Sequence, residues 1–101
     1  MAGNQDKPIE VSDPFARKLL DKYLENRKGD IERLTDALSV RDFESIRTTG
    51  HNLYGSGSAY GLDEVSRIGA GIEDAARSED APEIADLIDE LREFLTRMRL
   101  Y

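Results

Sequence analysis

The sequence contains no cysteine and no tryptophan, and it has a single histidine among its 101 residues. Without cysteine there can be no disulfide, no thiolate zinc site and no cysteine nucleophile, so packing must hold the fold together. No apolar run approaches the roughly 20 residues that cross a bilayer. The first ten residues also lack the apolar stretch of a signal peptide. We therefore expect a cytoplasmic protein.

Positive charge is scarce in this chain. The chain has fourteen Lys and Arg residues and twenty-one Asp and Glu residues, which gives a net charge of -7. Such a chain repels phosphate backbones and anionic lipid surfaces, so neither nucleic acid nor a membrane is an expected partner. The sequence shows no nucleotide-binding loop, no cluster of metal ligands and no catalytic triad, so we expect no cofactor and no metal site in this chain. Most acidic residues are interpreted as a solvated surface.

The length fits one domain with one core. Residues 1–11 show no apolar period and are interpreted as a flexible N-terminal leader. Residues 12–101 form the predicted domain. Asp13 and Pro14 are typical of a helix start, and the predicted first helix ends near Lys28. Gly29 and Asp30 are expected to interrupt the chain before a second helix.

Three further helices follow from the spacing of apolar residues and glycines. Asp42 is expected to cap the next helix, which Gly61 ends. Residues 77–80 form a predicted loop, and Asp80 with Glu83 resembles a capping box. The inward positions of the five predicted helices are, in chain order, Phe15, Leu19, Leu20, Tyr23 and Leu24; Ile31, Leu34 and Leu38; Phe43, Ile46, Gly50, Leu53, Gly57 and Tyr60; Leu62, Val65, Ile68, Gly69, Ile72 and Ala76; and Ile84, Leu87, Ile88, Leu91, Leu95 and Met98.

The predicted fold class is all-α. Several amphipathic helices with short connections indicate an antiparallel four-helix bundle with an additional N-terminal helix, and we expect a monomer. No segment has a convincing β pattern.

The segment 50–58, with the sequence GHNLYGSGS, lies in the middle of a predicted helix. An interior glycine costs about 1 kcal/mol relative to alanine, so three glycines there need a compensating role. Gly50 and Gly57 lie on the inward stripe, where they allow close approach of another helix, and Gly69 is expected to face them. Gly55 lies four residues after His51 on the outward face, where core packing does not explain a glycine.

The outward face around His51 is the candidate site. A neutral imidazole is a nucleophile, and histidine changes its charge near neutral pH, so the ring needs no neighbouring base to be phosphorylated. A glycine beside it leaves room for a bulky group on the ring and for a second protein. The other residues predicted to share this face are Arg47, Tyr54, Gly55 and Ser58.

Residues 51–57, HNLYGSG, resemble the H-x-L-K-G-S-G segment of bacterial histidine phosphotransfer (HPt) domains. The similarity extends to four other segments and covers about Asp13 to Met98. These segments are residues 23–27, Asp42 with Phe43, residues 60–62 and residues 72–76.

The resemblance implies a phosphorelay intermediary that is a covalent carrier rather than an enzyme. His51 would accept a phosphoryl group from a receiver-domain aspartate or a kinase and pass it to a response regulator. The implied partners are receiver domains, a hybrid sensor histidine kinase, or both. Magnesium is expected in the receiver rather than in this chain.

The sequence departs from the family at Tyr54, where HPt domains commonly have lysine. Arg47 and Ser58 are candidates to contact the phosphoryl group in its place. Tyr54 either contacts a partner or has replaced lysine by simple sequence drift, without a role of its own. Two alternatives stay open: an HPt-like bundle that binds receivers or kinases without phosphotransfer, and an enzyme that uses His51 as a general base. The second requires a pocket and an orienting carboxylate near the ring.

Overall fold

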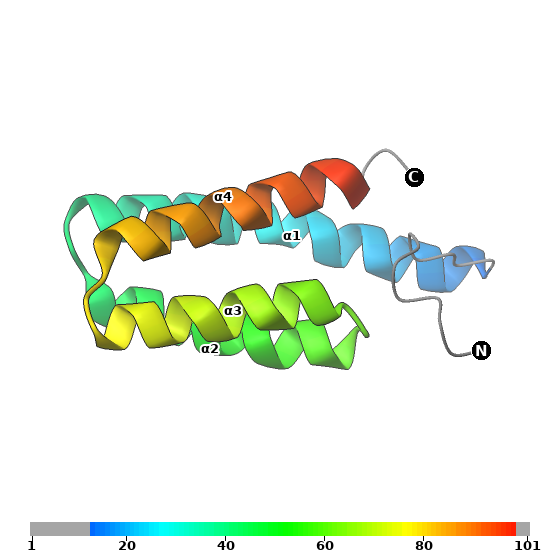
Figure 1. Ribbon diagram of the computed structural model, residues 1–101. Coiled ribbons are helices and arrows are strands. Elements are labelled where there is room, and N and C mark those ends of the chain that lie inside the picture. Colours follow the sequence, from blue (N-terminus) through cyan, green and yellow to red (C-terminus); the bar gives the residue numbers. More distant parts are fainter. Residues whose placement is uncertain (1–12, 99–101) are drawn as a thin grey trace.

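The computed structural model describes residues 13–98, which form four α-helices and no strand. The helices are α1 (Pro14–Ser39), α2 (Phe43–Ala59), α3 (Asp63–Arg77) and α4 (Ala81–Met98). They run up and down in an antiparallel bundle, with α1 beside α4 in one layer and α2 beside α3 in the other (Figure 1). The predicted all-α bundle is confirmed. The predicted leader, residues 1–11, and Ser12 lie outside the described residues.

Helix α1 is the main departure from the sequence prediction. No break occurs at Gly29 and Asp30, so the predicted additional N-terminal helix and the helix after it form one helix of 26 residues. Asp30 does not cap a new helix; instead, its carboxylate pairs with Arg27 at 3.1 Å and with Arg33, both on the same helix. These ion pairs, together with packing of α1 on α2 and α4, offset the helix cost of Gly29.

The core lies between the two layers and follows most of the predicted stripes. Leu34, Ile46, Leu53, Ile72 and Leu91 are among its fully buried side chains. Three predicted inward residues are exposed instead. Phe15 and Leu19 lie on the first turns of α1, which extend past the other helices (Figure 1), and Tyr60 lies at the end of α2. Phe94, which the predicted stripe omitted, is buried.

The helix ends follow mostly from local chemistry. The Asp13 carboxylate accepts a hydrogen bond from the Phe15 amide at 3.0 Å, and Asp80 accepts one from the Glu83 amide at 3.1 Å. The predicted stop at Gly61 is confirmed: its φ of 71° is a left-handed conformation that glycine adopts without strain. Arg41 and Glu79 also have positive φ, at 57° and 54°, and turn the chain between helices.

Candidate functional site

Helix α2 carries the predicted site, and its N-terminus is capped by Asp42. The Asp42 carboxylate accepts hydrogen bonds from the Ser45 hydroxyl at 2.7 Å and from the Ser45 amide at 3.1 Å. These two bonds lower the pKa of Asp42 below its usual value. A lower pKa keeps the carboxylate charged, and this negative charge interacts favourably with the positive end of the helix dipole. His51 lies two turns farther along this helix.

Glycines bring the backbones of α2 and α3 into contact at the site. A Cβ atom placed on Gly50 would lie 2.7 Å from the Glu73 nitrogen, and one on Gly69 would lie 2.5 Å from the Tyr54 nitrogen. On Gly57, a Cβ atom would lie 2.6 Å from the Ser66 nitrogen. No side chain fits at such distances, so these three glycines are packing residues, as the sequence predicts. Their contacts fix the register of α3 against α2.

The His51 side chain is 66% exposed, so the ring faces outward from the bundle as expected. Its Nδ1 atom lies 3.3 Å from Oε2 and 3.4 Å from Oε1 of Glu73 on α3. A carboxylate can only accept, so the neutral ring that fits this contact carries its proton on Nδ1. That tautomer leaves a lone pair on Nε2. The geometry therefore favours Nε2 as the nucleophilic atom.

Glu73 in turn belongs to an ion-pair chain on α3. Its Oε2 atom lies 3.0 Å from Nη2 of Arg77, whose Nη1 donates to the Asp74 carboxylate at 2.9 Å. The Glu73 side chain is only 14% exposed, although His51 and Arg77 are open to solvent. The imidazole of α2 is thus linked through Glu73 to two further charged side chains of α3, Arg77 and Asp74.

The sequence prediction missed Glu73, because it treated acidic residues as solvated surface and found no orienting carboxylate for His51. The glycines alone do not reveal this contact. Gly50, the residue before His51, was expected to face Gly69, but adjacent antiparallel helices set a residue one turn after Gly69 opposite residues before Gly50. Only the structure shows that the Glu73 nitrogen lies 2.7 Å from a Cβ atom placed on Gly50 and that the Glu73 carboxylate reaches His51.

Two predicted neighbours of His51 lie on the exposed surface of α2. Tyr54 is 49% exposed, and nothing lies within 4 Å of a Cβ atom placed on Gly55. The space beside the ring that the sequence predicts at Gly55 is therefore present. Arg47, one turn before His51, is half-buried and lies 3.6 Å from the Glu44 carboxylate on the same helix. Whether these residues contact a phosphoryl group stays a prediction.

Ser58 is bonded away from His51. Buried Ser66 uses its one hydroxyl proton for the Tyr54 carbonyl oxygen at 2.5 Å. The 2.7 Å contact between the hydroxyls of Ser58 and Ser66 must then use the Ser58 proton. Ser58 has no second proton, so it could donate to a phosphoryl group only if this bond broke. Its predicted role is not supported by this geometry.

The serine of the motif, Ser56, connects α2 to α1. Its hydroxyl lies 2.8 Å from the Tyr23 hydroxyl and accepts a hydrogen bond from Arg27 at 3.3 Å. Tyr23 also stacks on Tyr60, with ring centroids 4.2 Å apart, and Arg27 lies over the Tyr23 ring. This part of the motif therefore holds the helix that carries His51 against α1.

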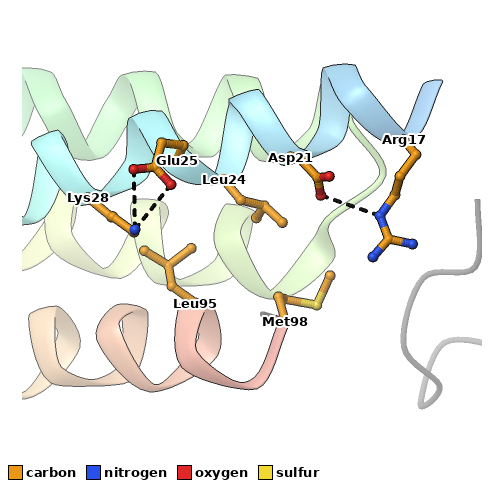
Figure 2. A pocket seen from close by; sticks show the side chains of 7 residues that line it. All are labelled: Arg17, Asp21, Leu24, Glu25, Lys28, Leu95 and Met98. Carbon is orange, nitrogen blue, oxygen red and sulfur yellow. Dashed lines mark hydrogen bonds and ion pairs between the residues drawn. The ribbon is translucent and has the colours of Figure 1, made fainter. Parts of the chain in front are cut away.

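A pocket of about 260 Å³ lies elsewhere, between α1 and α4 (Figure 2). Leu24, Leu95 and Met98 form its apolar lining, and two ion pairs of α1, Arg17 with Asp21 and Lys28 with Glu25, line it as well. None of the predicted site residues lines this pocket. The carboxylate that a general base at His51 requires is present, but this pocket does not serve it.

Within residues 13–98, no group of three or more His, Cys, Asp or Glu side chains is placed to hold a metal ion. No helix in the same range has the length and apolar character to span a membrane.

The fold and site define a class of protein: a four-helix bundle that presents an exposed histidine at mid-helix, backed by a carboxylate of the adjacent helix. The family model of the Hpt domain matches residues 18–100. The chain therefore belongs to the Hpt domain family, whose members act in phosphorelay phosphotransfer of two-component signalling. No curated protein and no solved structure matched the chain significantly.

Proposed function

We propose that His51 accepts a phosphoryl group on Nε2 from a receiver-domain aspartyl phosphate or a kinase and passes it to a response regulator. The observation that carries this proposal is the exposed His51 ring, whose Nδ1 atom faces Glu73. Exposure allows a second protein to reach Nε2, and the Nδ1 contact selects the tautomer with a lone pair there. Family membership supplies the reaction class.

The transfer step needs little from this chain besides a positioned ring. The Nε2 lone pair attacks phosphorus, a P–N bond forms, and the P–O bond to the donor aspartate breaks, which releases its carboxylate. The ring keeps its Nδ1 proton and gains a positive charge. The Glu73 carboxylate, 3.3 Å away, stabilises this developing charge. The reverse sequence at a second receiver regenerates the neutral ring.

The partners in this proposal are receiver domains and, where the donor is one, a hybrid sensor histidine kinase. The magnesium ion that the reaction requires belongs to the receiver, so this chain acts as a covalent carrier and not as an enzyme. We place the carrier in the cytoplasm as a monomer. Support for a protein partner comes from the open surface at Gly55 and from the exposed Tyr54 beside the ring.

A second candidate is an HPt-like bundle that binds receivers or kinases without turning over phosphate. Tyr54 favours it, because this residue stands where the family commonly has a lysine and it carries no positive charge. Glu73 favours the carrier, because binding alone needs no oriented imidazole.

Phosphorylation of the purified chain distinguishes the two candidates. Incubation with a phosphorylated receiver should label the protein, and the label should be stable in alkali and labile in acid, as expected for phosphohistidine. His51→Gln should abolish labelling, since the chain has no other histidine. Undiminished labelling of that variant would refute the site, and binding of receivers without any labelling of the native chain would favour the second candidate.

A further inference from the structure

We infer that Arg77 is a positioning residue for the phosphoryl acceptor: it holds the Glu73 carboxylate against Nδ1 of His51 and thereby fixes the orientation and tautomer of the ring. Arg77 lies at the end of α3, outside the motif around His51. Its effect on the rate of phosphorylation rests on the proposed function, whereas its effect on the orientation of the ring does not.

The contact between Glu73 and His51 is too long to hold the carboxylate in place. Charge-assisted hydrogen bonds usually span 2.7–2.9 Å, and the two carboxylate oxygens lie 3.3 and 3.4 Å from Nδ1. The shorter contact of the carboxylate is the one to Arg77, at 3.0 Å. Of the two partners that Glu73 contacts here within residues 13–98, Arg77 is therefore the stronger one.

Arg77 is itself held in place by two features of α3. Its guanidinium spans two adjacent carboxylates, those of Glu73 and Asp74, and so uses two of its nitrogens in a fork. It is also the last residue of the helix, where a cation is favoured by the helix dipole. A glutamate four residues before an arginine is the favourable order for such a pair.

Loss of Arg77 should release the carboxylate rather than unfold the bundle. Arg77 is 58% exposed, and its ion-pair partners Glu73 and Asp74 lie outside the hydrophobic core, so its removal should leave the core packing intact. Glu73 would keep only its long contact to the ring, and its carboxylate would turn toward water. The ring would then exchange between tautomers and orientations, and the fraction with a free Nε2 lone pair would fall.

The structural test measures the ring directly. Nitrogen-15 chemical shifts of His51 in the neutral ring report the share of the tautomer protonated on Nδ1. We expect this share to fall in Arg77→Gln and to recover only in part in Arg77→Lys, which restores a cation but not the guanidinium fork. Arg67→Gln is the matched control, because Arg67 is 57% exposed on the same helix and pairs with Glu64 and Glu90 instead. An unchanged tautomer share in Arg77→Gln would overturn the inference.

The kinetic test uses phosphoramidate, a small phosphodonor that needs no docking surface. Arg77→Gln should slow labelling of His51 about two- to fivefold, the range expected for a half-exposed ion pair. In a Glu73→Ala background the same substitution should have no effect, because Arg77 acts through Glu73. Equal slowing in both backgrounds would show a direct role of Arg77 and overturn the inference. Absence of any labelling in the native chain would instead contradict the proposed function and leave the tautomer result to decide on Arg77.

Discussion

At the scale of single residues, the proposed site combines the exposed His51 of α2 with the Glu73 carboxylate of α3. His51 was predicted from the sequence, since the motif and the exposed glycine beside it depend only on local order along the chain. Glu73 was not, because its role arises from a contact 22 positions away. The role of Ser58 as a donor to the phosphoryl group stays a prediction, and the structure shows its hydroxyl hydrogen-bonded to Ser66 on another helix.

Tyr54 departs from the HPt resemblance, in which this position commonly holds a lysine. Substitution Tyr54→Lys should speed phosphorylation of His51 or lengthen the life of phosphohistidine, because an ammonium one turn away can contact the phosphoryl oxygens. The site is exposed, so the gain should be about 1 kcal/mol or less, which is several-fold, and it should shrink with added salt. Rates and hydrolysis half-lives at low and high salt measure it.

Tyr54→Met is the control for the same position, because it removes the aromatic ring without adding charge. If Tyr54 anchors a partner, both substitutions should weaken binding of that partner, and only lysine should affect the phosphoryl group. A lysine variant with native rates, native half-life and native affinity would show that Tyr54 is not a functional departure.

At the scale of helices, boundaries were predictable where a side chain accepts a hydrogen bond from a backbone amide close in sequence. The caps at Asp13, Asp42 and Asp80 follow from residues close in sequence. The break predicted at Gly29 failed because local signals were weighed without tertiary packing and ion pairs. A glycine costs about 1 kcal/mol in a helix, which contacts with two other helices readily offset.

The paired helices α2 and α3 should respond oppositely to alanine at two glycines. Gly69→Ala should destabilise the protein by about 1–3 kcal/mol or more, since its Cβ would meet backbone atoms of α2 at 2.5–2.8 Å. Gly55→Ala meets nothing within 4 Å and should stabilise it by up to about 1 kcal/mol. Urea unfolding of both variants measures the difference. Equal effects would mean that the interface between α2 and α3 is not as close as described.

At the scale of the whole molecule, the four helices leave the His51 side chain 66% exposed on the surface of the bundle. The bundle class was predictable because amphipathic helices with short connections leave few other arrangements. The register between α2 and α3 could have been inferred from their facing glycines, whereas the exposed start of α1 could not. The apolar residues at the start of α1 have the spacing of a core stripe. Phe15 and Leu19 are nevertheless exposed, because the other described helices are too short to cover them.

In the proposed function, the exposed ring requires a partner to bring its own active site to the surface around Gly55, where nothing lies within 4 Å of an added Cβ atom. Gly55→Gln should therefore slow transfer from a phosphorylated receiver at least tenfold, since a long side chain one turn from the ring occupies the space through which the receiver approaches. The same variant should react with phosphoramidate at close to the native rate, because a small donor needs no such clearance. The two rates, measured on one preparation, separate docking from the chemistry of the ring. Gly55→Ala is the matched control: it also raises helix propensity, by at least as much as glutamine, but with a side chain of one carbon, so receiver transfer should stay near native. If Gly55→Gln slowed both reactions equally, the glutamine would be disturbing His51 itself. If it slowed neither, the open space at Gly55 would not be where the partner binds, and the docking surface would have to lie on another side of the ring.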